Sequence, residues 1–163
     1  LMETGAPEFD QADYDLARKF WDDYSDAEIE GSLANIKGVA PDEVYDEVRK
    51  SPLTEYIAPY KRIDYAMPGS TDVGDVSYCT PTAQLGTCCW ANGTPGHTWQ
   101  VAAQDGSSIG HKGMIAASKA LALAVIRTME DPELLKKAHE EYVKTTGGKY
   151  ICPVPPETVP LFD

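Results

Sequence analysis

The chain has 163 residues, 42% of them hydrophobic, so it is long enough for one domain that buries a sizeable core. Its net charge of −12, from 26 acidic and 14 basic residues, would repel a phosphate backbone, so we expect no nucleic-acid partner. No stretch approaches the roughly 20 apolar residues of a membrane helix, and "LMETGAPEFD" lacks the features of a secretory signal, so we expect no membrane partner.

The first third of the chain predicts helices. Asp10 can cap the first one, and Asp13 adds negative charge to its first turn. Phe9 and Tyr14 could pack across this start as a hydrophobic staple. An apolar stripe at helical spacing follows and predicts that the helix lies on a core: Leu16, Ala17, Phe20, Trp21 and Tyr24.

Two shorter helices come next. Ser25 and Glu28 have the spacing of a capping box, which predicts a second helix that ends at Gly38. Pro41 at a first helical position then opens a charged helix that reaches Pro52.

Three later segments favour extended structure. Residues 60–67, "YKRIDYAM", are typical of an edge strand, and residues 84–91, "QLGTCCWA", of a strand buried on both faces. Residues 98–104, "TWQVAAQ", could form a third strand or an extended loop.

The last third returns to helix. Residues 113–129 are so apolar that this helix must be buried on much of its circumference. Asp131 as N-cap and Pro132 at the first helical position predict another helix, which runs to Gly147. Helices flanking a few apolar strands indicate an α/β fold in layers, with too few strands for a complete sheet.

The cysteines match neither a disulfide framework nor a zinc pattern: Cys79, Cys88, Cys89 and Cys152. We expect them to be reduced, small buried residues of a cytoplasmic protein. A thiol pair of Cys88 or Cys89 with His97 is disfavoured, because a buried strand is a poor place for a reactive thiolate.

Two segments between residues 68 and 113 could carry chemistry. In "PGSTDVGDVS", Asp72 and Asp75 follow a predicted strand end, where α/β sheets collect ligands. In "GTPGHTWQ", a tight bend holds His97, which could be a metal ligand oriented by a carboxylate such as Asp72. Spacing alone leaves open that His97 is an ordinary polar residue on a bend.

The other histidines are less informative. His111, in "SSIGHKGM", could be a polar residue in the first turn of a helix or a substrate contact at the helix N-terminus. His139 lies among charged residues and is expected at the surface. No nucleotide-binding loop and no nucleophile elbow occurs in the sequence.

Four motifs occur in a recognisable order: "GAPEF" before a helix, "GSTDVGDVSY", "PGHTWQ" and "SSIGHKGM". They closely resemble the C-terminal part of amidohydrolases of the p-aminobenzoyl-glutamate hydrolase type. This group is one of the cocatalytic dimetal peptidases, which include aminoacylases and carboxypeptidase G. The resemblance covers residues 5–153.

The resemblance implies a three-layer α/β/α aminopeptidase-like catalytic domain that is interrupted by a smaller lid domain, which usually mediates dimerisation. Such enzymes cleave the amide bond of an N-acyl amino acid or a dipeptide. Two divalent ions, zinc or manganese, hold a bridging water, and a glutamate takes its proton. A homodimer or a paired subunit is expected.

The motifs also assign residues by similarity. His97 matches the last metal ligand of the family, and Asp72 falls where relatives have an acidic pair that supports the metal site or positions substrate. Thr94 and Gly96 match the loop that lines the substrate pocket. His111 matches no known ligand, and its role stays open.

The chain departs from the family in one respect, because it contains no candidate for the other metal ligands or for the glutamate base. We therefore expect residues 1–163 to be the C-terminal portion of the catalytic domain, without the lid domain and the N-terminal half, and to be inactive alone. The alternative is a non-catalytic family member or a subunit that acts as a protein-binding module.

Overall fold

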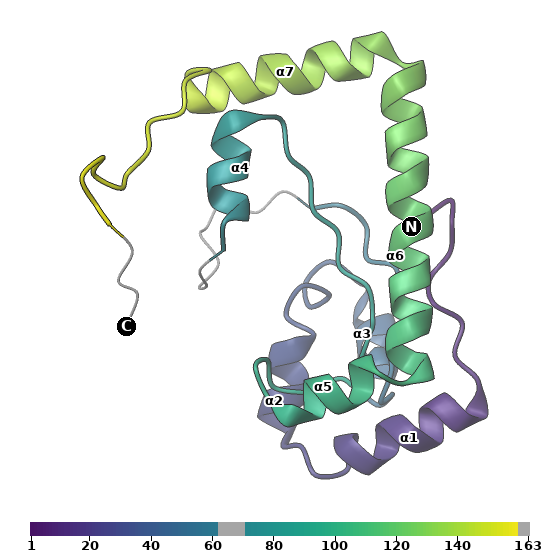
Figure 1. Ribbon diagram of the computed structural model, residues 1–163. Helices are drawn as coiled ribbons and strands as arrows, with labels where there is room; N and C mark the ends of the chain where they lie inside the picture. Colours follow the sequence, from purple (N-terminus) through teal and green to yellow (C-terminus); the bar gives the residue numbers. More distant parts are fainter. Residues whose placement is uncertain (62–70, 160–163) are drawn as a thin grey trace. The chain divides into compact units, whose positions relative to one another are not determined.

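The computed structural model describes residues 1–61 and 71–159 and contains seven α-helices within these ranges (Figure 1). No β-strand occurs in the described part of the chain. The helices are α1 (Gln11–Trp21), α2 (Asp26–Ser32), α3 (Asp42–Val48), α4 (Val73–Cys79), α5 (Trp99–Asp105), α6 (Ser108–Glu130) and α7 (Pro132–Thr146).

The chain forms two units. Unit 1 comprises residues 1–64 and 85–124, and unit 2 comprises residues 65–84 and 125–163. Unit 1 therefore holds α1, α2, α3, α5 and most of α6, whereas unit 2 holds α4, the end of α6 and α7.

The start of α1 confirms its sequence prediction. The Asp10 side chain accepts hydrogen bonds from the backbone N–H groups of Ala12 and Asp13, and Asp13 closes a capping box by accepting from the Asp10 N–H. The rings of Phe9 and Tyr14 pack edge to face with centroids 6.4 Å apart, as a hydrophobic staple does.

The next two helices begin close to where the sequence predicts. Ser25 and Glu28 form the predicted capping box of α2, but the helix ends at Ser32, well before Gly38. Pro41 is the N-cap of α3 and precedes its first helical position, one residue away from the prediction.

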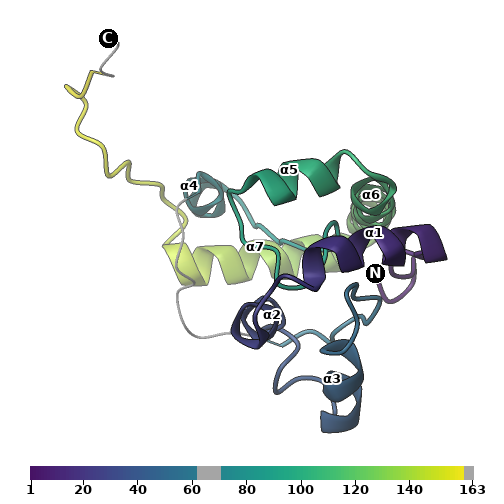
Figure 2. The same cartoon turned by 90° about the horizontal axis from the view of Figure 1, so that it is seen from below.

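The core of unit 1 consists of two clusters. One brings together side chains of α1, α6 and the intervening loops: Ala17, Leu53, Ala91 and Ile109. The other lies on α2 and the turns after it: Ile29, Leu33, Ile36 and Ala40. Figures 1 and 2 both place α1 and α5 beside the beginning of α6, and the Phe20 and Trp99 rings lie 6.1 Å apart between α1 and α5.

The predicted α/β fold with a few strands is wrong. Residues 98–104 lie mostly in helix α5, whose alanine and glutamine residues have higher helix propensity than the strand interpretation assumed. Residues 84–91 form an extended segment that pairs with no strand in the described ranges. Instead, Thr87 Oγ1 of this extended segment donates to Gly113 O of α6 at 3.0 Å. A strand needs a hydrogen-bonding neighbour, and an apolar run alone does not supply one. Most of the predicted strand at 60–67 lies outside the described residues.

Helix α6 begins at Ser108, before the predicted start at Gly113, and most of its predicted burial is absent. An 18-residue window of this helix has a mean hydropathy of 1.3, which with the helix length reaches the range of membrane-spanning helices, contrary to the sequence expectation, although core helices of soluble proteins reach it too. Only 28% of its apolar stretch is buried. Large apolar side chains are exposed along it: Met114, Ile115, Leu121, Val125, Ile126 and Met129.

Unit 2 is held together in part by tyrosine hydroxyls. Tyr142 Oη of α7 donates to Tyr78 O of α4 at 2.9 Å, and Tyr150 Oη donates to Asp75 Oδ1 at 3.1 Å. Helix α7 has the predicted Asp131 cap and ends at Thr146, and its C-cap is Gly147, whose φ of +76° favours glycine.

The cysteines form no disulfide in the described ranges, and they are not uniformly buried. Cys79 and Cys152 are exposed, whereas Cys88 and Cys89 are half-buried. The prediction of four buried thiols is therefore wrong for two of them, which lie at the end of a short helix and in the extended tail.

Candidate functional site

His97 lies on a bend between Gly96 and helix α5. Its φ of +59° makes it the only non-glycine residue with positive φ in the described ranges. The side chain is exposed, and no hydrogen bond or ion pair to the imidazole occurs in the described part of the chain. An exposed imidazole without a partner is free to bind a metal ion.

The chain just before His97 is fixed to the rest of unit 1. Asn92 Nδ2 donates to Ser51 O at 2.9 Å, and Asn92 Oδ1 accepts from Thr54 Oγ1 at 2.8 Å. Gly93 N–H donates to Ser32 Oγ at 2.9 Å. A side chain at Gly93 would have a strained φ of +89°. This Asn-Gly turn is therefore a rigid base for the residues that follow.

Thr94 is buried, and its hydroxyl has two partners. Its Oγ1 donates to Ala91 O at 2.7 Å and accepts from Gln104 Nε2 at 3.1 Å. Gly96 is exposed, with open space where a side chain would start. Thr94 thus holds the turn, while contact of Thr94 or Gly96 with substrate stays a prediction.

Asp72 belongs to unit 2 and is the N-cap residue of α4, although its side chain makes no capping hydrogen bond. Residues 62–70, just before Thr71, lie outside the described ranges, so a preceding strand is not tested. Asp75, in the first turn of α4, accepts the hydrogen bond from Tyr150. The pairing of Asp72 with His97 stays a prediction.

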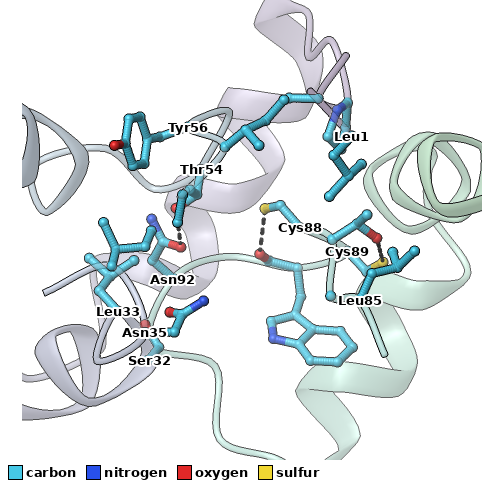
Figure 3. Close-up of a pocket in the computed structure, with 18 of the residues that line it drawn as sticks. Leu1, Ser32, Leu33, Asn35, Thr54, Tyr56, Leu85, Cys88, Cys89 and Asn92 are labelled. Carbon is cyan, nitrogen blue, oxygen red and sulfur yellow. Dashed lines mark hydrogen bonds between the residues drawn. The ribbon is translucent and has the colours of Figure 1, made fainter. Parts of the chain in front are cut away.

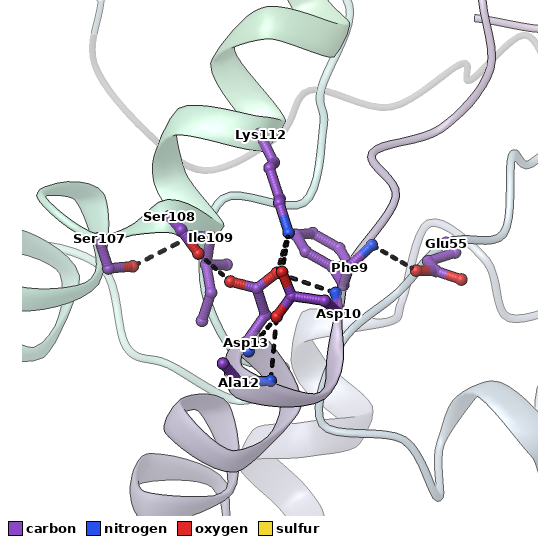
Figure 4. A network of polar contacts seen from close by, with 9 residues as sticks. All are labelled: Phe9, Asp10, Ala12, Asp13, Glu55, Ser107, Ser108, Ile109 and Lys112. Atoms are coloured by element: carbon purple, nitrogen blue, oxygen red, sulfur yellow. Dashed lines mark hydrogen bonds and ion pairs between the residues drawn. The ribbon is translucent and has the colours of Figure 1, made fainter.

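The "SSIGHKGM" motif joins α6 to α1 through a buried carboxylate (Figure 4). Asp13 is 1% exposed and accepts hydrogen bonds from Ser108 Oγ and Lys112 Nζ. Lys112 Nζ also donates to Asp10 Oδ2 at 2.8 Å. One ammonium thus binds both carboxylates of the α1 cap.

The charges of this cluster support one another. Burial alone raises the pKa of Asp13, but hydrogen bonds from Lys112 and Ser108 lower it, and the net pKa lies below the ordinary value. The hydrogen bond from Lys112 lowers the pKa of Asp10. In turn, Asp10 and Asp13 raise the pKa of Lys112.

The glycines of the same motif allow close contacts. A Cβ on Gly110 would clash with the backbone of Asp105, and one on Gly113 would clash with Cys88 O and Cys89 Sγ. His111 of this motif is exposed and lines a cavity of about 380 Å³, which Lys119 also lines. Its role stays open between a polar surface residue and a substrate contact.

A second cavity, of about 390 Å³, lies between the extended segment and the loop after α3 (Figure 3). Thr54, Asn92 and Cys88 line it, but His97 does not. Burial raises the pKa of the Cys88 thiol to about 11, and its Sγ donates to Trp90 O at 3.4 Å. A protonated thiol is a poor nucleophile, which agrees with the rejection of a thiol–histidine pair.

The fit of a metal can be judged from the donors. His97 offers one accessible imidazole on a fixed turn, which fits a single ligand position. In residues 1–61 and 71–159, no three His, Cys, Asp or Glu side chains converge on one point. The described residues therefore fit one ligand of a metal centre and not a complete centre.

A comparison with curated proteins decides the relationship. The chain is 34% identical over 164 aligned positions to a subunit of the p-aminobenzoyl-glutamate hydrolase of Escherichia coli (strain K12). The alignment covers 98% of this chain. The resemblance carried by the motifs is confirmed. The chain spans 34% of the length of this hydrolase subunit.

Two further comparisons give no match. No model of a protein family matches the chain. No solved structure matches it significantly.

Sequence reasoning missed two parts of this region. The sequence allows a strand or an extended loop at Gln104, and nothing in it marks this residue as the partner of Thr94. The bond between Lys112 and Asp13 joins positions 99 residues apart, which periodicity cannot reveal. The Asn92-Gly93 dipeptide, a strong turn signal, could have indicated the anchored turn.

Proposed function

We propose that this chain is the His97-bearing part of a metal-dependent amidohydrolase. Its relative is named a hydrolase of p-aminobenzoyl-glutamate, a compound in which an amide bond joins an aromatic acyl group to an amino acid. The substrate class is therefore an N-acyl amino acid or a dipeptide. The exposed imidazole of His97 on an anchored turn is the observation that carries the proposal.

The part played by this chain is to hold one ligand in place. A bound zinc or manganese pair would polarise the amide carbonyl of the substrate and would lower the pKa of a bound water toward neutral pH. The neutral imidazole of His97 would donate one nitrogen lone pair, and its turn would keep the ring away from the core. Asp72 would orient that ring or the substrate, and Thr94 would keep the turn closed.

The chain alone is proposed to be inactive. In the described part of the chain, His97 belongs to no cluster of three potential metal ligands. A single imidazole leaves most of the coordination to water, so metal binding should be weak. The other ligands and the general base would come from a preceding part of the protein or from a paired subunit.

An assay of p-aminobenzoate release tests this proposal in two steps. The 163-residue chain, supplied with zinc or manganese, should show no turnover above the metal alone. The protein expressed from the complete reading frame that encodes the chain should hydrolyse p-aminobenzoyl-glutamate. In that protein, His97→Ala should abolish the activity, whereas His139→Ala, on α7, should not. Turnover by the 163-residue chain alone, or full activity of the His97→Ala enzyme, would contradict the proposal.

The exposed face of α6 favours a second candidate, a non-catalytic subunit that binds another protein. Met129 and Val125 are 78% and 59% exposed, and such apolar patches mark surfaces that another chain covers. The complete reading frame separates the two candidates. Metal-ligand motifs and paired glutamates upstream favour the enzyme, and their absence favours the binding role.

A further inference from the structure

We infer that Gln104 is the positioning residue for the turn that carries His97. This inference rests on the proposed role of His97 as a metal ligand. Gln104 lies near the end of α5, and its side chain is 0% exposed. A buried primary amide is costly unless its donors and acceptor are bonded.

Each polar group of the Gln104 amide has a partner within the same stretch of chain. Its Oε1 accepts from Ala91 N–H at 2.8 Å, and its Nε2 donates to Thr94 Oγ1 and to Gln100 O, both at 3.1 Å. Ala91 and Thr94 precede His97 in the sequence, whereas Gln104 follows it on α5. The side chain therefore closes the segment that contains His97 into a ring.

Further hydrogen bonds stabilise the segment that Gln104 closes. Thr94 N–H and Oγ1 both donate to Ala91 O, at 3.1 and 2.7 Å. Around the bend itself, Thr98 Oγ1 donates to Pro95 O at 2.8 Å. This bond spans only the residues next to His97, whereas the bonds of Gln104 tie the whole bend to the buried residues before it.

His97 needs such a constraint because of its backbone. A non-glycine residue at φ +59° lies in the left-handed region, which L-residues rarely adopt, and it persists only where its surroundings enforce it. The imidazole makes no hydrogen bond of its own in the described ranges, so the backbone is what fixes where its Cα–Cβ bond points. Gln104 thereby sets the position from which the imidazole is presented.

Nuclear magnetic resonance of the 163-residue chain tests this. The amide order parameter of His97 should be about 0.85, as in rigid backbone, and should fall toward about 0.6 in Gln104→Met, which keeps the side-chain length but has no hydrogen-bonding groups. The Ala91 amide should also lose its protection from hydrogen exchange. Ile36→Val, a mild core change that removes no hydrogen bond of the turn, is the matched control and should leave His97 rigid.

Gln104→Glu separates positioning from a merely structural role. At about pH 5 its buried carboxyl group is protonated and can still donate to Thr94, so His97 should stay rigid. At about pH 8 an ionised carboxylate has no donor, and the turn should loosen while α1 and α2 stay folded. This variant also remains informative if Gln104→Met fails to fold.

The outcomes keep the two ideas apart. An unchanged His97 order parameter in Gln104→Met, or no pH effect in Gln104→Glu, would overturn the positioning role whatever His97 binds. If the wild-type His97 backbone is rigid but the resonances of its imidazole do not respond to zinc, the metal-ligand proposal is overturned instead. The hydrogen bonds by which Gln104 holds the turn are unaffected by that result.

Discussion

Lys112 of α6 forms an ion pair with Asp13 of α1, a carboxylate that is 1% exposed. Lys112 is itself about one-third exposed and also contacts Asp10, which is largely exposed. The charge of the buried Asp13 is therefore compensated by the more accessible Lys112. This contact fixes the motif that contains His111 against the first helix, so its loss should affect the whole of unit 1.

Replacing Lys112 by methionine should destabilise the chain strongly. Asp13 would remain buried without a counter-charge, which typically costs about 3 kcal/mol. Urea denaturation followed by circular dichroism measures the change. Lys119→Met on the same helix is the control and should alter the free energy of unfolding by less than about 0.5 kcal/mol. Equal effects of both substitutions would show that the ion pair does not stabilise the fold.

Acid should weaken the fold through the same cluster. The pKa values of Asp10 and Asp13 are lower in the folded chain than their ordinary value of 3.8, so the folded state binds fewer protons than the unfolded state. Their contribution is fully present above about pH 5 and is lost as pH falls through the lowered values. Asp13→Asn should show a shallower decline in unfolding free energy below about pH 4; an unchanged slope would contradict the assignment.

Gly113→Ala should destabilise unit 1 because the new methyl group would meet Cys88 O and Cys89 Sγ. Overpacking of this kind costs about 1–3 kcal/mol. Gly31→Ala, in α2, has open space around the new methyl group and should be neutral or stabilising by up to about 1 kcal/mol. Thermal denaturation compares the two, and equal melting temperatures would contradict the close approach of the extended segment to α6.

Alkylation should separate the cysteines. The pKa of the Cys88 thiol is raised to about 11 by burial, so little thiolate forms near pH 8. Cys88 should therefore react at least about tenfold more slowly than the exposed Cys79. Mass spectrometry of peptides after iodoacetamide treatment gives both rates. Rapid alkylation of Cys88 at this pH would indicate that the extended segment does not pack against α6.

Local signals in the sequence predicted three of the helix starts well. Asp10, Ser25 and Asp131 each act as the predicted cap, because capping depends on residues only two or three positions apart. The bend at His97 was likewise predictable from its glycines and proline. The metal-ligand role proposed for His97 rests on the ordered motifs, since spacing alone leaves it undecided.

Contacts between distant positions were not predictable. Residues 84–91 have the composition of a buried strand, but a strand also needs a neighbouring strand, and the described structure supplies α6 instead. Likewise, the apolar pattern of α6 predicted burial, yet burial depends on what covers a helix, which its own sequence does not contain. Gln104 gave no signal because its partners are mostly backbone groups and one threonine hydroxyl.

A zinc titration of the 163-residue chain, followed through the imidazole nitrogen resonances, tests the central claim most directly. The three histidines act as internal controls, because His111 and His139 are exposed as His97 is. We predict that the His97 nitrogens shift first, with weak affinity, and that His97→Ala removes this response. Equal shifts of all three histidines, or no shift of His97, would contradict its assignment as a metal ligand.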